Sequence, residues 1–149
     1  MKILVINPGS TSTKIAVYEN ETPLLVRNIK HTVEELSVYP QVIDQFEFRK
    51  NLVLQELEAN GIPFAFDAVI GRGGLVKPIP GGVYAVNEAM KQDTLHAMRT
   101  HACNLGGLIA AELASALPHC RAFIADPGVV DEREAVSYTH LTLPTILRV

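Results

Sequence analysis

The first 30 residues contain three strand-like segments in close succession, and this feature constrains the fold more than any other. Residues 2–7 (KILVIN) are a short, apolar run that is typical of a buried strand. Residues 13–19 alternate, with Ile15 and Val17 on one face, and residues 23–30 form a third strand-like run after a polar turn. Connections this short cannot carry the chain back for parallel pairing, so we expect an antiparallel meander.

The chain then alternates between helix and strand patterns. The expected helices cover residues 39–61, 88–98 and 104–117, and the expected strands cover residues 66–71, 81–86 and 120–126. Gly61 suits the end of the first helix, while Asn87 and Asn104 suit the starts of the other two. A meander followed by such units predicts one α/β domain.

The composition is that of a globular chain and excludes some classes of partner. Hydrophobic residues make up 48% of the chain, and the net charge of −3 gives no attraction for nucleic acid or an anionic membrane. The apolar run at residues 3–6 is shorter than the ~7–15 residues of a signal-peptide core, and no run approaches the ~18 residues of a membrane span. We therefore expect a cytoplasmic protein with no nucleic-acid or membrane partner.

A turn rich in hydroxyl groups joins the first two strands. In residues 6–14 (INPGSTSTK) the first strand runs into Pro-Gly, and four hydroxyl side chains and Lys14 follow. A phosphate-binding P-loop needs a second glycine before the lysine and a helix after it, and the sequence has neither. We interpret the segment as a β-hairpin tip, in which Gly9 allows either close approach of a ligand or a positive φ.

This tip carries groups that suit phosphate. It offers consecutive hydroxyl donors from Ser10, Thr11, Ser12 and Thr13. Its backbone N–H groups can form an anion nest, Asn7 provides an amide where a carboxylate would repel phosphate, and Lys14 adds positive charge. The alternative is a solvated Ser/Thr turn, which is a common use of such residues.

Two charged residues at strand ends suit a site that handles anions. Arg72 follows the strand expected at residues 66–71, between glycines, and its planar guanidinium matches carboxylate or phosphate. Asp126 ends the last expected strand, where a carboxylate can hold Mg²⁺, usually through water. The alternatives are a surface salt bridge for Arg72 and a turn-initiating Asp-Pro for Asp126. Asp131 and Glu132 are weaker candidates for the acidic role.

His101 and Asn104 flank the start of the last expected helix, whose first turn contains Gly106 and Gly107. Small residues there would let a ligand reach the N–H groups at the positive end of the helix dipole. A partly buried, hydrogen-bonded histidine is an equally good interpretation of His101. The histidines and cysteines lack the spacings of a zinc site, so we expect none.

These motifs resemble the acetate and butyrate kinase family. ILVINPGSTSTK is similar to that family's N-terminal signature, and three later stretches resemble butyrate kinases in order and spacing. They are GRGGLVKPIPGGVYAVN (71–87), HACNLGGLIAAELA (101–114) and FIADPGVVDE (123–132). The resemblance implies a ribonuclease H-like domain of the actin and acetate kinase type. It also implies phosphoryl transfer between ATP and a short-chain carboxylate such as butyrate, which gives an acyl phosphate.

The resemblance also implies roles for individual residues. The ATP phosphates would be cradled by Asn7, Gly9, Ser10, Thr11, Ser12 and Lys14. Arg72 would bind the carboxylate or the transferring phosphoryl group, Asp126 would organise Mg²⁺, and His101 and Asn104 are candidates for further substrate contacts. Acetate or propionate kinase, and a non-catalytic nucleotide-binding module of the actin type, stay open as alternatives. We expect the full-length enzyme to be a homo-oligomer.

The resemblance covers residues 1–135 and then stops. Residues 136–149 (VSYTHLTLPTILRV) alternate like a strand with an internal proline and match nothing expected in this fold, so we interpret them as a spurious or frame-shifted end. Gly128 is a smaller departure from the family pattern. In that family a second domain makes most of the contacts with adenosine. The resemblance finds no counterpart of it here, so we expect the chain to be inactive alone.

Overall fold

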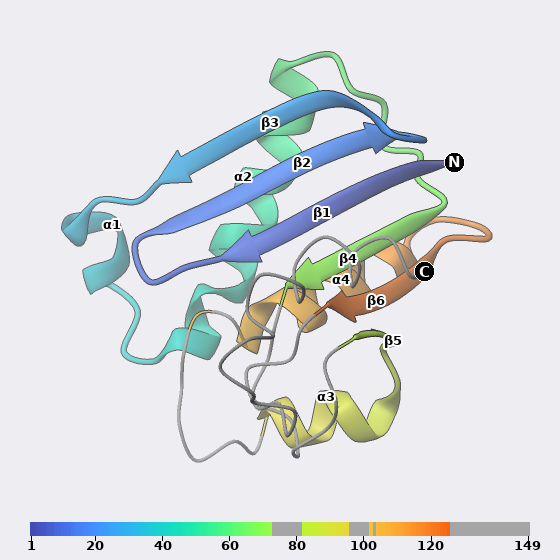
Figure 1. Ribbon diagram of the computed structural model, residues 1–149. Coiled ribbons are helices and arrows are strands. Elements are labelled where there is room, and N and C mark those ends of the chain that lie inside the picture. The colour runs from blue at the N-terminus through green and yellow to red at the C-terminus, as the bar shows by residue number, and fades with distance from the viewer. Residues whose placement is uncertain (73–81, 96–101, 103, 126–149) are drawn as a thin grey trace, which may run out of the picture.

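A six-stranded mixed sheet forms the centre of the computed structural model, which describes residues 1–72, 82–95, 102 and 104–125 (Figure 1). The strand order is β3-β2-β1-β4-β6-β5. The strands are β1 (Lys2–Pro8), β2 (Ser12–Glu19), β3 (Thr22–Lys30), β4 (Ala68–Arg72), β5 (Val83–Ala85) and β6 (Arg121–Ala125).

The first three strands form the predicted antiparallel meander. β1 pairs with β2 from Lys2 opposite Glu19 to Pro8 opposite Thr13, and β2 pairs with β3 along its length. Buried and less buried residues alternate along β1 and β2. This alternation follows because successive side chains of a strand point to opposite faces of the sheet.

The other half of the sheet is mostly parallel. β4 pairs in parallel with β1, β6 pairs in parallel with β4, and β5 adds an antiparallel edge to β6. The four residues from Ala68 to Gly71 are all buried, which is typical of a central strand in a parallel sheet. The predicted α/β class, with a meander followed by α/β units, is confirmed.

The first predicted helix, over residues 39–61, is wrong at its start. A short helix α1 (Val33–Ser37) and a 3₁₀ turn η1 (Val42–Gln45) precede α2 (Phe46–Ala59). Local caps explain the division, because Thr32 caps α1 and the Gln41 N–H donates to the Asp44 carboxylate at 3.0 Å. The predicted helix stop is confirmed, since Gly61 follows the end of α2 with a φ of 66°.

The two later helices begin where the sequence predicts. Asn87 caps α3 (Glu88–Leu95), and its Oδ1 accepts the Met90 N–H at 2.8 Å. α4 (Asn104–Ser115) begins at the predicted residue and ends two residues before the predicted end.

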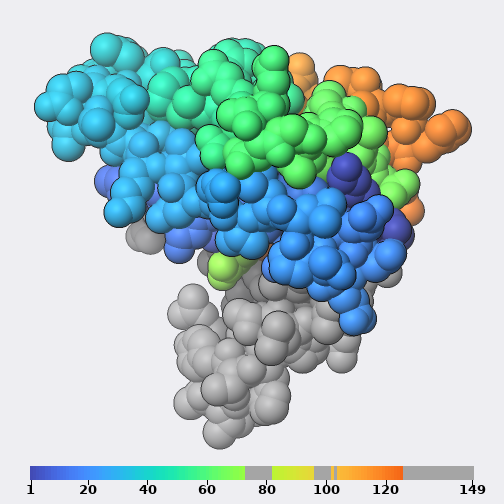
Figure 2. Space-filling view, turned by 90° about the horizontal axis from the view of Figure 1, so that it is seen from above, coloured from blue at the N-terminus to red at the C-terminus, as the bar shows by residue number. Residues whose placement is uncertain are grey.

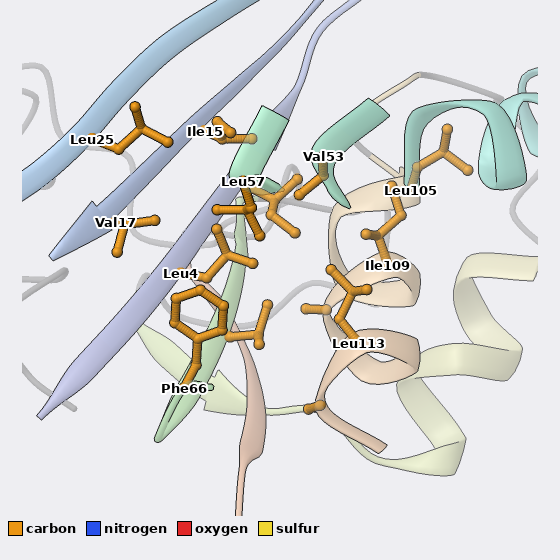
Figure 3. Close-up of a cluster of buried hydrophobic side chains, with 14 residues drawn as sticks. Leu4, Ile15, Val17, Leu25, Val53, Leu57, Phe66, Leu105, Ile109 and Leu113 are labelled. Atoms are coloured by element: carbon orange, nitrogen blue, oxygen red, sulfur yellow. The ribbon is translucent and has the colours of Figure 1, made fainter. Parts of the chain in front are cut away.

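The hydrophobic core lies between one face of the sheet and helices α2 and α4 (Figure 3). The sheet contributes Leu4, Ile15, Val17 and Leu25, α2 contributes Val53 and Leu57, and α4 contributes Leu105, Ile109 and Leu113. Figure 2, which looks down on β3, shows the α2 layer stacked on one side of the strands. Each such side chain contributes roughly 1.5–3 kcal/mol when fully buried, so this layer fixes the sheet on which the site is built.

Candidate functional site

Three polar side chains that are distant in the sequence form one row across neighbouring strands. Lys14 on β2 lies opposite Asn7 on β1. Ile6 on β1 lies opposite Gly71 on β4, so the next residue of β4, Arg72, follows beside Asn7. Residues that are paired across strands share a face of the sheet. We therefore call Lys14, Asn7 and Arg72 the polar row.

The polar row lies on the face of the sheet that points away from α2 and α4, toward the viewer in Figure 1. A hollow of about 420 Å³ on this face is bordered by Asn7 and Lys14, and a second of about 40 Å³ is bordered by Arg72. Val5 borders both hollows, so they adjoin. Among the described residues that line the two hollows, none is acidic. The arrangement therefore suits an anion.

Arg72, the last residue of β4, is exposed. Within the part of the chain that the structure describes, its guanidinium has no hydrogen bond or ion pair, so the salt-bridge alternative finds no support there. The neighbouring strand β6 places Ala125 opposite Arg72. A planar fork with five N–H donors is thus presented at the carboxyl edge of the parallel strands.

The hairpin tip, residues 9–12, lies beyond the polar row and confirms the strand–turn–strand interpretation. The Gly9 N–H donates to the Ser12 carbonyl oxygen at 2.7 Å and closes the tip. Gly9 does not have a positive φ, so that explanation of the glycine is wrong. A Cβ there would lie an ordinary 3.4 Å from the Ser12 carbonyl oxygen. Close approach of a ligand to Gly9 stays a prediction.

The carbonyl oxygens of the tip are occupied by donors from the protein. The Thr11 carbonyl accepts the His31 N–H at 2.8 Å, the Ser12 carbonyl accepts from Arg49 Nη1 at 3.0 Å, and the Ser10 carbonyl accepts from Arg49 Nη2 at 3.4 Å. Among the described residues, nothing accepts the backbone N–H groups of Ser10 and Thr11. The tip thus keeps its donors for a ligand, which is the polarity of an anion nest.

Arg49 lies behind this tip and is absent from our sequence-based candidates. The side chain is 0% exposed, its Nε donates to Gln45 Oε1 at 3.0 Å, and its Nη1 also donates to Thr13 Oγ1 at 3.1 Å. Burial lowers the pKa of Arg49 to about 10, which leaves it charged at neutral pH. The sequence holds a signal, because Arg49 precedes the buried Val53 and Leu57 at four-residue spacing and so lies on their helix face.

Thr13 and His31 complete a buried cluster under the tip. Thr13 Oγ1 lies 2.8 Å from His31 Nε2, and the His31 ring packs edge-on against Phe48 with centroids 5.3 Å apart. Burial and, to a lesser degree, the charge of Arg49 lower the pKa of His31, so the imidazole is neutral at pH 7. Thr13 therefore faces the interior, and our grouping of its hydroxyl with the phosphate donors is wrong.

Three glycines let α4 pack directly on the ends of β4 and β6. A Cβ on Gly71 would collide with the backbone of Gly106. A Cβ on Gly106 would lie 2.6 Å from the carbonyl oxygen of Arg72, and one on Gly107 would lie 2.8 Å from Ile124 Cγ2. Our interpretation of these helix glycines as room for a ligand is wrong, because strand atoms occupy that space.

The remaining candidates are only partly described by the structure. Asn104 is 7% exposed at the start of α4. His101, Asp126 and the weaker acidic candidates lie outside the described residues, as do Gly128 and the tail at 136–149. β6 ends at Ala125, which lies opposite Arg72. Asp126 directly follows Ala125 in the sequence. The proposed roles of Asn104, His101 and Asp126 stay predictions.

Two further properties concern metal binding and membranes. Within residues 1–72, 82–95, 102 and 104–125, no three histidine, cysteine or acidic side chains gather as a metal site. None of the helices in these ranges is long and apolar enough to cross a bilayer.

Cys120 is a free thiol. Burial is the main cause that raises its pKa, and the charge of Asp67 is the second.

Comparisons with known proteins find relatives among the kinases. Over 137 residues the chain is 95% identical to a probable butyrate kinase from Bacteroides thetaiotaomicron. This match covers 92% of this chain and 39% of the relative. Over 132 residues it is 58% identical to a probable butyrate kinase from Phocaeicola vulgatus, which covers 89% and 37%. The chain thus spans less than two fifths of the length of these curated relatives. The crystal structure of an acetate kinase from Entamoeba histolytica matches 88% of this chain and 35% of its own, at 17% identity and a TM-score of 0.48. No family model matches the chain.

Proposed function

We propose that this chain, which is homologous to part of the probable butyrate kinases, forms the phosphate-binding part of a carboxylate kinase. The reaction is the transfer of a phosphoryl group from ATP to a short-chain carboxylate, with butyrate as the first candidate, giving ADP and an acyl phosphate. The observation that carries the proposal is the convergence of the polar row and the hairpin tip at one edge of the sheet. The proposal includes a cytoplasmic, homo-oligomeric full-length enzyme.

The hairpin tip binds the ATP phosphates in this proposal. The N–H groups of Ser10 and Thr11 and the hydroxyls of Ser10, Thr11 and Ser12 donate to phosphate oxygens. The Asn7 amide and the Lys14 ammonium approach from the polar row. Phosphoryl transfer depends mainly on positioning and on neutralising charge, and these groups supply both.

Arg72 acts on the second reactant. Its planar guanidinium can take the carboxylate or the transferring phosphoryl group in a bidentate geometry. A carboxylate nucleophile carries no proton at neutral pH, so no general base is required. Arg72 therefore orients the nucleophile or stabilises the charge that develops during transfer.

A bound Mg²⁺ would neutralise phosphate charge and hold the phosphates in line. The described residues that line the two hollows include cations and amides but no carboxylate, so our candidate for the metal ligand comes from outside the described residues. Asp126, which directly follows β6, is our candidate.

A chimera tests the function directly. Residues 1–125 of this chain replace the matching segment of the Bacteroides relative, and hydroxylamine traps any acyl phosphate formed from ATP and butyrate. We expect turnover within about tenfold of the relative. The polypeptide of residues 1–149 alone should give negligible product. Reacting groups have to be held within about 0.5 Å of their productive positions, and the phosphate-binding part of the site alone does not hold both reactants in that way.

Two outcomes of this assay would change the proposal. ATP binding by the chimera without carboxylate-dependent turnover would contradict it and favour the non-catalytic nucleotide-binding module. Faster turnover with acetate or propionate than with butyrate would replace the substrate. Pocket size separates these acids, and each methylene contributes about 1–3 kcal/mol of discrimination.

Replacing Gly9 with valine in the chimera should weaken ATP binding about tenfold or more, equivalent to one lost phosphate contact. The branched side chain would occupy the space through which phosphate approaches the tip, and calorimetric titration measures the change. The fold should be retained, because a Cβ at Gly9 makes only ordinary contacts with Ser12. Wild-type ATP affinity in a folded Gly9→Val chimera would rule out phosphate binding at the tip.

A further inference from the structure

The guanidinium of Arg49 is buried, and the part of the chain that the structure describes offers it no counter-ion. All three of its nitrogens donate hydrogen bonds, and the acceptors are the Gln45 amide, the Thr13 hydroxyl and the carbonyls of Ser10 and Ser12. None of these groups is charged. Within the described residues no carboxylate forms an ion pair with Arg49. The described residues therefore leave its positive charge unbalanced, directly under the hairpin tip.

This position is unfavourable for a residue that serves stability alone. Buried charges are normally paired, since removing an ion from water is costly. Arg49 also lies in the first turn of α2, where the helix dipole disfavours a cation. An apolar side chain of similar length would avoid both costs. The features that favour arginine here are the two tip carbonyls and a bound anion on the other side of the tip.

We propose that Arg49 is a positioning residue of the nucleotide site, which holds the tip carbonyls inward and whose charge is balanced by the phosphates of bound ATP. This inference rests on the proposed function of the tip. Arg49 itself donates to protein acceptors and needs no contact with the nucleotide. Arg49 acts on the nucleotide indirectly, because it holds the carbonyls of Ser10 and Ser12 and because its charge attracts the phosphates electrostatically.

The hydrogen bonds explain why the loss of Arg49 would alter the tip in particular. Among the described residues, the Ser10 carbonyl accepts no other hydrogen bond, whereas the Ser12 carbonyl keeps the Gly9 N–H and Thr13 keeps its contact with His31. Without Arg49 the Ser10 peptide is free to rotate. Its carbonyl oxygen can then point toward the phosphates, where it repels them, and the adjacent Thr11 N–H turns away from them.

The test compares two substitutions in the chimera. Arg49→Met removes the charge and the donors but keeps an unbranched side chain, while Arg49→Lys keeps the charge and loses the planar fork. We expect Arg49→Met to raise the Kd for ATP about tenfold, the loss of roughly one charge-assisted interaction, and Arg49→Lys to raise it less. The Kd for adenosine should stay within about twofold in both variants, because adenosine has no phosphate to respond.

Leu57→Ala is the matched control. Leu57 lies on the same buried face of α2, two turns after Arg49, and is not bonded to the tip. Its truncation should lower the urea midpoint of unfolding and leave the Kd for ATP within about twofold. A purely structural role for Arg49 predicts that ATP and adenosine weaken alike, in proportion to the lost stability.

The outcomes separate this inference from the proposed function. A wild-type chimera that neither binds ATP nor forms acyl phosphate would contradict the proposed function itself. A functional wild-type chimera whose folded Arg49→Met variant keeps its ATP affinity, or loses adenosine affinity equally, would overturn the role of Arg49 alone. If Arg49→Met does not fold, Arg49→Lys decides, because unchanged ATP affinity in that variant overturns the positioning role.

Discussion

Replacing Arg72 with lysine in the chimera is expected to lower kcat/KM for the carboxylate roughly ten- to a thousandfold, the usual loss for one strong transition-state contact. Lysine keeps the charge, so the expected loss reflects the bidentate geometry of the guanidinium. The fold should be unaffected, because Arg72 is exposed and makes no hydrogen bond or ion pair within the described residues. Steady-state kinetics with varied butyrate measure the effect.

The control for Arg72→Lys is Arg121→Lys. Arg121 is also an exposed arginine, but it lies at the other end of the parallel strands, where its guanidinium packs 5.1 Å from the Phe123 ring centroid. We expect its kcat/KM to stay within about twofold of wild type. Equal kinetics in the two variants would return Arg72 to the surface-residue interpretation.

Replacing Gly71 with alanine is expected to destabilise the chimera by about 3 kcal/mol or more, at the upper end of the range for overpacking. The added Cβ would collide with the backbone of Gly106, and backbone cannot move aside as a flexible side chain can. Helix α4 would have to move away from β4 and so open the core around Leu105 and Ile109. The midpoint of urea unfolding measures the loss.

Gly9→Ala is the matched glycine substitution. Its Cβ would make only ordinary contacts, so we expect a change in the free energy of unfolding of about 0.5 kcal/mol or less. If the Gly71→Ala chimera has the same urea midpoint of unfolding as the wild-type chimera, the inference that α4 packs closely on β4 is wrong.

Local patterns predict the meander and most element boundaries, because each depends on residues close together in the chain. Alternation in residues 13–19 and short connections are sufficient for antiparallel pairing, and Asn87 and Gly61 mark helix ends through contacts within a few residues. The division of residues 33–59 into α1, η1 and α2 depends on equally local caps at Thr32 and Gln41, which the apolar pattern alone does not reveal.

The site is predicted less completely because its geometry depends on distant partners. Asn7, Lys14 and Arg72 are identified one by one from their chemistry, but only the strand register joins them into a row. The packing of Gly106 against Arg72 depends on a partner more than 30 residues away in the sequence. Arg49 is overlooked for a related reason, since a charged residue on a helix is normally exposed and its acceptors lie in the first hairpin.

The parallel pairing of β1 with β4 has a consequence for the order in which the site forms during synthesis on the ribosome. The hairpin of β1 and β2 needs only the first 19 residues, so Asn7 and Lys14 can meet early. Arg72 joins them only when β4 docks, and β4 is held from behind by α4 through Gly71 and Gly106. Contacts of such long sequence separation form late in folding. A nascent chain that has not yet exposed α4 therefore brings Asn7 and Lys14 together without Arg72, and its polar row stays incomplete until α4 packs on β4.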